Sequence, residues 1–390
     1  MKKITLLALV FGMAVPCFSF FPFFYGARSL ALGYSSLAFN YDVNAIYLNP
    51  ALLTQLTVPL GGYQYGSSSL DFRDISGRLA AARAYDLEHF QDLALPSREA
   101  ALSELNAAFS ADASINGFRM NGPGYAGKGY AFSIVTVDAA LVHPLANPVL
   151  AKPVAEVSDA DIASLRVRFT GFHYRDYSLA VAFPVSQGLA VGATLHYLKG
   201  KHAVFDAALN AGPFVPGADA GAADLLQAAW SDAGSGFSKF NFDLGAGLEL
   251  GQHLKAGLVM KNVGNPVIVT AAGDLRLARR LVAGLIFRPD NQLGIYLDVD
   301  LAAGDLFHDG VDAQPLSLGV EKGLFQNKLF LRAGLLSDLA AAYFVGPKAN
   351  VLYGFGCGFN LGNFLVDLAL GLDPQGRVKN LGVSGFYAIR

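Results

Sequence analysis

Residues 292–301 have the sequence QLGIYLDVDL, in which apolar and polar positions alternate strictly. On an extended chain, successive side chains point to opposite faces, so the alternation gives one apolar and one mixed polar face. The same alternation recurs in 240–250 (FNFDLGAGLEL) and in 364–371 (FLVDLALG). About ten residues are enough for a tilted strand to cross the hydrocarbon core of a bilayer. These stretches therefore predict strands that could line the wall of a membrane β-barrel.

The composition agrees with an apolar chain that is rich in strands. Hydrophobic residues make up 53% of the 390 residues and charged residues only 15%, against about a quarter charged in soluble domains. The net charge of −2 offers no basic surface for a phosphate backbone, so we expect no nucleic-acid partner. After the first residues, no run of about 18–20 apolar residues lacks Gly, Pro or Asn, which excludes a bundle of membrane-spanning helices.

The beginning of the chain has the pattern of an export signal. Lys2 and Lys3 precede an apolar run from Ile4 to Val15, and small residues at Cys17 and Ser19 suit cleavage after Ser19. This predicts a signal peptide over 1–19 that is removed on export. An uncleaved anchor and lipidation of Cys17 remain as alternatives. After cleavage Cys357 is the only thiol left, which excludes an intrachain disulfide.

Candidate strands with apolar alternation fill most of the remaining chain. They are 57–66, 130–142, 164–174, 176–184, 188–199, 237–250, 253–263, 278–288, 292–302, 314–324, 328–338, 348–361, 363–373 and 378–389. The connections between many of them alternate between turns of a few residues and long loops, as in barrels of the outer membrane. Only a closed sheet pairs every backbone group in hydrocarbon without helices. The fold class expected is all-β, a transmembrane antiparallel barrel of about 14 strands that spans 57–390.

Three regions depart from the strand pattern. The segment 20–56 lacks strand periodicity, and we expect it to plug the lumen. Apolar residues at helical spacing predict a helical extracellular insertion over 67–120 after the first strand, with Ser97 as an N-cap. The long loop 200–236 carries a further helix candidate at 222–230. These helices would either shield loop backbone or form a lid over the mouth.

Two motifs of the N-terminal region carry a resemblance to a known family. They are GARSLALG at 26–33 and Asn49-Pro50-Ala51, and later blocks at 177–197, 254–266 and 316–334 support them. The chain resembles the FadL-type outer-membrane transporter superfamily and its PorV-like and TraF-like branch. The resemblance implies a barrel of 14 strands whose N-terminal segment folds into the lumen as a hatch. It also implies that Asn49, Pro50 and Ala51 belong to this hatch.

The resemblance implies a bacterial outer-membrane protein that passes small hydrophobic compounds through a barrel gated by the hatch. The alternatives are a secretion-accessory or protein-docking barrel without small-molecule transport, and a structural barrel with no substrate. Expected partners are therefore membrane lipid, a hydrophobic small molecule and, for the secretion-accessory alternative, a secreted protein.

Charged residues of both signs lie on the predicted lumen face of the strands. They are Asp243, Glu249, Lys255, Lys261, Asp298, Asp300, Glu321, Arg332 and Asp367. A ring of one sign would indicate an ion-selective pore. Mixed signs favour charge pairs that hold the hatch or brace the wall.

The sequence offers no catalytic or metal-binding pattern. GPGYAGK at 122–128 matches the first seven positions of a phosphate-binding loop, but Gly129 stands where a Ser or Thr must hold magnesium. We therefore interpret it as a glycine-rich loop before a strand at Tyr130. The seven histidines lack the spacing of a zinc site. We expect no enzyme activity, no catalytic residue, no metal site and no cofactor.

Overall fold

A computed structural model provides the structure of the chain. It describes residues 26–40, 42–72, 78, 81–82, 84–109, 114–145, 147–208, 235–270, 273–277, 279–305, 312–339, 351–374 and 376–389. The predicted signal peptide, the helix expected at 222–230 and residues 20–25 of the predicted hatch lie outside these residues. No helix within the described ranges is long and apolar enough to cross a membrane.

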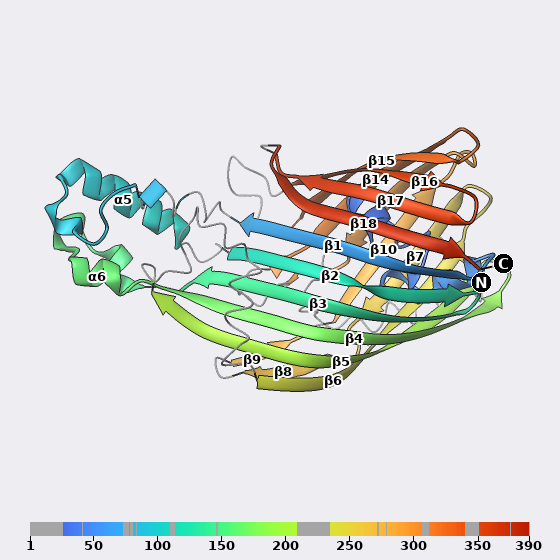
Figure 1. The fold of residues 1–390 in the computed structure, drawn as a ribbon, viewed down its shortest axis with the longest axis horizontal. Coiled ribbons are helices and arrows are strands. Elements are labelled where there is room, and N and C mark those ends of the chain that lie inside the picture. The colour runs from blue at the N-terminus through green and yellow to red at the C-terminus, as the bar shows by residue number, and fades with distance from the viewer. Residues whose placement is uncertain are drawn as a thin grey trace.

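Fourteen strands form a closed antiparallel barrel (Figure 1). In spatial order they are β1 (Leu60–Phe72), β18 (Val378–Ala388), β17 (Phe364–Leu372), β16 (Leu352–Asn360), β15 (Leu329–Asp338), β14 (Pro315–Leu324), β11 (Leu293–Asp300), β10 (Arg280–Phe287), β7 (Leu254–Lys261), β6 (Ser235–Glu249), β5 (Leu189–Ala208), β4 (Arg166–Ser186), β3 (Tyr130–Pro144) and β2 (Ser114–Gly127). Pairing of β1 with both β18 and β2 closes the sheet, so the predicted fold class is confirmed.

The number of strands predicted was right because two errors cancelled. The stretch 114–127 is a strand, so GPGYAGK lies within β2 and is not a loop. Its low apolar content and Pro123 hid it, and pairing with β3 is interrupted at Gly122 and Pro123. Conversely, the predicted strands 164–174 and 176–184 are one strand, β4, which continues through Arg175 and Asp176. With β2 included, the connection 145–165 falls on the long-loop side.

The outer face of the barrel is mostly apolar, whereas the inner face carries polar and small residues and, on β2 to β4, apolar residues such as Met120 and Val137. In β11 the buried positions are Gly294, Tyr296, Asp298 and Asp300, and the positions between them face outward, as the alternation predicted. Outward side chains such as Phe183 and Phe240 are 61% and 67% exposed. Two small hairpins, β8–β9 (Val267–Thr270 and Gly273–Arg276) and β12–β13 (Gly304–Asp305 and Asp312–Ala313), lie in loops outside the barrel sheet.

A small helical head stands beyond the wall at the ends of β2 to β5 (Figure 1). It contains η2 (Phe90–Asp92), α5 (Leu95–Ala108), η3 (Pro148–Ala151), η4 (Val154–Glu156) and α6 (Asp159–Ala163). The β1–β2 and β3–β4 connections pack together through a core that includes Phe90, Leu105 and Leu165 and continues onto Val167 and Phe169 of β4. The predicted insertion 67–120 was too wide, because β1 continues to Phe72 and β2 begins at Ser114. The predicted loop 200–236 is likewise shorter, because β5 continues to Ala208.

The helix predicted in the insertion begins earlier than expected. Ser97 is not the N-cap, because α5 begins at Leu95 with Ala94 as its N-cap and Pro96 in its first turn. Proline is favoured there because its missing N–H would have no partner in the first turn.

Candidate functional site

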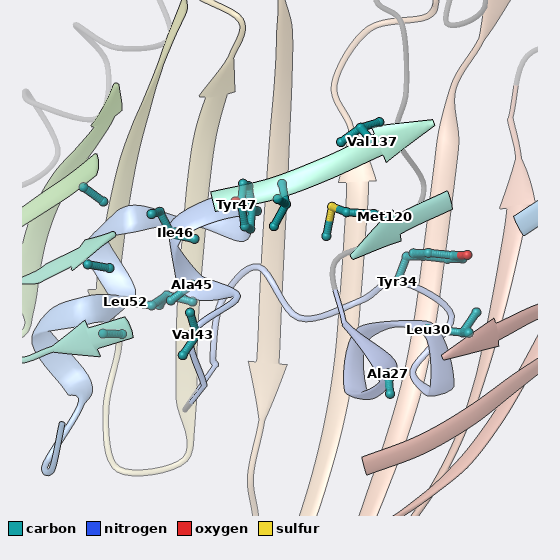
Figure 2. Packing of buried hydrophobic residues seen from close by; sticks show 14 of the residues in the cluster. Ala27, Leu30, Tyr34, Val43, Ala45, Ile46, Tyr47, Leu52, Met120 and Val137 are labelled. Carbon is teal, nitrogen blue, oxygen red and sulfur yellow. The ribbon is translucent and has the colours of Figure 1, made fainter. Parts of the chain in front are cut away.

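Residues 26–56, here called the N-terminal segment, lie inside the barrel (Figure 2). They form α2 (Ala27–Ala31), α3 (Ala45–Leu48) and η1 (Pro50–Gln55). Leu30, Leu32, Ile46, Leu52 and Leu53 are completely buried. Helix α2 contacts β15 to β18, whereas η1 contacts β4, β5 and β6. The N-terminal segment therefore spans the lumen from one side of the wall to the other.

Glycines in the wall allow the backbone of the N-terminal segment to approach closely. A Cβ at Gly334 or Gly354 would overlap the backbone between Leu30 and Gly33, and one at Gly245 would overlap the side chain of Asn49. Gly245 and Gly354 thus leave room in the lumen for the segment. The absence of side chains at these positions lets the segment lie directly on the sheet.

Arg28 joins the N-terminal segment to a buried charge network in the wall. Its Nε lies 3.1 Å from Glu321 Oε2, and its Nη2 donates to the Tyr296 hydroxyl at 2.7 Å. Arg332 donates to the same Glu321 at 2.7 Å and to Asp367 Oδ1 at 2.5 Å. Arg28 is 1% exposed, so this ion pair is shielded from solvent. Removing one partner of such a buried pair is strongly destabilising.

Other wall side chains bind the backbone of the N-terminal segment. Asp298 Oδ2 accepts from the amides of Ser36 and Leu37 at 2.8 and 2.9 Å. Lys261 donates to the carbonyl of Tyr47 at the end of α3. The segment is thus fixed by directional contacts with several separate strands, in addition to its apolar packing.

The Asn-Pro-Ala motif begins the last helix of the segment. The Asn49 side chain accepts from the amide of Ala51 at 3.1 Å, with Pro50 in the first turn of η1. Its Nδ2 also donates to the carbonyl of Ala246 on β6 at 3.0 Å. Asn49 therefore both caps η1 and attaches it to the wall.

The predicted lumen charges lie in two groups. Asp243, Lys261, Asp298, Asp300, Glu321, Arg332 and Asp367 are all buried. Glu249 and Lys255 lie near the short turn between β6 and β7 and pair with each other at 2.7 Å, with the Glu249 side chain 49% exposed. Lys261 pairs with Asp243 at 2.8 Å.

Several residues of the lumen were not predicted as site residues from the sequence. Arg280 pairs with Asp300 at 2.7 Å, and Asp176 binds His196 at 3.0 Å. His196 lies two residues after Thr194 on the same strand, so the alternation would have placed it in the lumen. The inward orientation of Asp176 was missed because a strand boundary was wrongly predicted next to it. Arg28 belongs to the motif at 26–33. It precedes the strands, so no alternation of inward and outward positions indicates its orientation.

The cluster around His196 is not arranged for nucleophilic catalysis. Ser178 Oγ and Asp176 Oδ2 both contact His196 Nδ1, at 2.9 and 3.0 Å. In a catalytic triad the nucleophile and the acid contact opposite ring nitrogens. The other nitrogen, Nε2, lies 3.4 Å from Asp243 Oδ2. This cluster joins β4, β5 and β6. Within the described residues, no group of three or more His, Cys, Asp or Glu side chains could hold a metal ion.

Burial changes the pKa of a carboxyl group in the N-terminal segment. Burial raises the pKa of Asp42 to about 6, while the nearby charge of Arg28 acts in the opposite direction. The amide of Asn44 donates to this carboxyl at 2.6 Å.

In the described part of the chain, cavities lie beside the N-terminal segment. One, of about 70 Å³, lies between Tyr47, Met120, Val137 and the polar side chains of Asp176 and His196. Another, of about 50 Å³, lies between Tyr34, Leu37 and Asp298. A cavity of about 150 Å³ holds benzene in a protein core. These two cavities can hold water, but a ring of that size would require the segment or the wall to move.

No known protein-family profile and no curated protein sequence matches the chain. Solved structures do match over nearly its whole length. The chain is similar to the CymD monoaromatic hydrocarbon channel, with 14% identity, a TM-score of 0.53, and 95% of this chain and 99% of that chain covered. It is similar to a Pseudomonas aeruginosa FadL homologue, with 9% identity, a TM-score of 0.53, and 96% and 99% covered. It is also similar to the P. putida toluene transporter TodX, with 11% identity, a TM-score of 0.52, and 94% and 99% covered. At these identities the likeness shows a shared barrel fold, and the PorV-like or TraF-like branch stays a prediction.

Proposed function

We propose that the chain is a channel of the bacterial outer membrane, exported with a leader that is removed after Ser19. The apolar outer face and the closed sheet support this location, since every strand of the barrel has hydrogen-bonded neighbours on both sides. The C-terminal end of the chain lies at the short-turn end of the barrel (Figure 1), where the amide of Ile389 donates to the carbonyl of Pro59 ahead of β1. In outer-membrane barrels the short turns face the periplasm, so the helical head would face the exterior.

The compounds that we propose for this channel are small and hydrophobic. The similar structures include a monoaromatic hydrocarbon channel and a toluene transporter, which supports this class. The N-terminal segment would act as the hatch predicted from the sequence, because among the described residues it packs across the lumen, and the two cavities beside it measure about 50 and 70 Å³. Passage of an aromatic ring would therefore require this hatch to shift.

The observation that carries the proposal is how the hatch is attached. Its contacts with the wall are ion pairs, hydrogen bonds and apolar packing, as at Arg28–Glu321 and at the amides bound by Asp298. Contacts of this kind can break and form again, so the hatch can leave and return.

A reversible crosslink tests whether the hatch must move. A Cβ at Gly247 on β6 would lie 3.8 Å from the Cβ of Ala51, which matches the mean separation in disulfides. In a Cys357→Ser background, Ala51→Cys with Gly247→Cys should stop uptake of a labelled monoaromatic hydrocarbon by cells when oxidised. Reduction should restore it, and each single cysteine variant is the control. Undiminished uptake through a fully oxidised barrel would refute gating by this segment.

The helical head supports the second candidate function, a secretion-accessory barrel that docks another protein. Its core of Phe90, Leu105 and Leu165 continues onto Val167 and Phe169 at the start of β4, so the head could present a surface that is held rigidly on the barrel. Purification in mild detergent distinguishes the two functions. A stoichiometric protein partner that is lost when the head is deleted favours docking, whereas extracted apolar small molecules favour transport.

A further inference from the structure

A row of aromatic side chains crosses the outer face of the barrel on three neighbouring strands. Tyr177 on β4 lies directly opposite Tyr197 on β5, which lies opposite Phe240 on β6. The ring centroids are 6.1 and 4.9 Å apart. Aromatic residues of membrane proteins gather where hydrocarbon meets the headgroups. This row therefore marks the boundary of the bilayer on the side of the long loops.

Basic residues follow on the same outer face, two and four residues closer to the long loops than the aromatic row. Arg175 pairs in register with Lys199, and His173 pairs with Lys201. Side chains two residues apart share a face of the strand. Arg175, Lys199 and Lys201 are exposed. We call these three residues the basic rim.

Among the described residues, no acidic side chain pairs with the charges of the basic rim. Like charges directly opposite each other on a sheet are destabilising. In the described part of the chain, none of Arg175, Lys199 and Lys201 has an ion-pair partner. The next residues on the same face differ, because Arg119 and His173 share Asp138 at 2.6 Å each. An external anion would relieve the repulsion within the basic rim.

We propose that the basic rim binds anionic, phosphate-bearing lipid headgroups of the leaflet on the long-loop side. The inference uses the membrane location given under Proposed function but does not depend on transport. Two residues along a strand tilted by about 40° rise roughly 5 Å along the membrane normal, and four residues roughly 10 Å. The headgroup layer extends about 5–8 Å beyond the hydrocarbon on each side. The basic rim therefore lies at and just above the depth of lipid phosphates.

Lipid titration of the full-length protein in detergent micelles, followed by native mass spectrometry, tests this proposal. Phosphatidylglycerol should bind more tightly than phosphatidylcholine, and increasing sodium chloride should reduce the difference. Each cation near an anionic lipid surface contributes about fivefold in affinity. The variant Arg175→Gln, Lys199→Gln, Lys201→Gln should therefore lose at least about tenfold of the preference for phosphatidylglycerol.

A variant with the same loss of charge provides the control. Lys128→Gln, Lys152→Gln, Lys328→Gln changes three exposed lysines that lie on short turns or in the head, and it should keep most of the preference. Equal binding of the two lipids by the unmodified protein would overturn the proposal, as would an equal loss in both variants. Displacement of the lipid by inorganic phosphate, beyond that by chloride at equal ionic strength, would indicate a site for soluble phosphate and would also overturn it.

Discussion

Replacement of Arg28 by methionine should release the hatch without unfolding the barrel. Methionine keeps most of the length and apolar packing of the side chain but removes the ion pair with Glu321 and the hydrogen bond to Tyr296. Loss of one partner from a buried ion pair costs about 3–5 kcal/mol. Because Glu321 keeps Arg332 at 2.7 Å, we expect the lower limit, about 3 kcal/mol. This corresponds to roughly a hundredfold increase in the ratio of released to seated hatch, since about 1.4 kcal/mol is tenfold.

Single-channel recording in planar bilayers measures that ratio as the fraction of time that the channel is open. Arg28→Met should increase this fraction about a hundredfold, whereas Arg280→Met should change it little, because the Arg280–Asp300 ion pair lies within the wall. Both variants should keep the slow electrophoretic mobility of an unheated, folded barrel. Equal open fractions in Arg28→Met and the unmodified protein would refute the prediction that Arg28 holds the hatch in place. An equally large effect of Arg280→Met would also refute it.

Three further variants test the closeness of the hatch, the head and the effect of pH. Gly334→Ala should lower the melting temperature by an amount equivalent to at least the roughly 1–3 kcal/mol of an overpacked core, whereas Gly385→Ala, where a Cβ would meet no atom within 4 Å, should not. Leu105→Ala should lose about 2–5 kcal/mol of stability in the head and expose it to limited proteolysis; the control Leu95→Ala, at a side chain 47% exposed, should leave it protected. Because burial raises the pKa of Asp42 to about 6, this carboxyl favours the folded state at low pH, and that contribution is lost as the pH rises through about 6. Asp42→Asn should therefore raise the melting temperature at pH 8, by the equivalent of up to about 3 kcal/mol, and leave it nearly unchanged at pH 4.

The fold could be predicted wherever one face of a strand contacts an apolar environment and the other face does not. This condition holds in β11, where every inward position was assigned correctly from the alternation. It fails in β2, whose glycines and Pro123 leave no apolar period. The condition fails again at Arg175, which was predicted to lie at a break between two strands. A charged residue on the outer face fits a transmembrane strand only where the strand extends beyond the hydrocarbon. The sequence does not indicate that depth.

Of the candidate site, only the residues contributed by the barrel strands could be predicted from the sequence. Parity along a strand determines which residues face inward, so residues such as Asp243 and Glu321 could be named from the sequence. Their partners are decided by how the barrel closes around the N-terminal segment. Arg28 and Glu321 are separated by 293 positions, and no periodicity connects an irregular segment with a strand.

The contacts of the hatch differ in kind around the barrel, and this difference suggests how it moves. On the side of β2 to β4 the segment packs on apolar side chains such as Met120 and Val137. On the side of β11 to β15 it is held by charged groups, chiefly Asp298 and Glu321. Apolar contacts are non-directional and tolerate small shifts, whereas charged hydrogen bonds need a defined geometry. We therefore expect the hatch to separate first from β11 to β15 and to pivot on β2 to β4. Arg28 is then the residue whose loss should change opening most, because it belongs to the contacts that must break first.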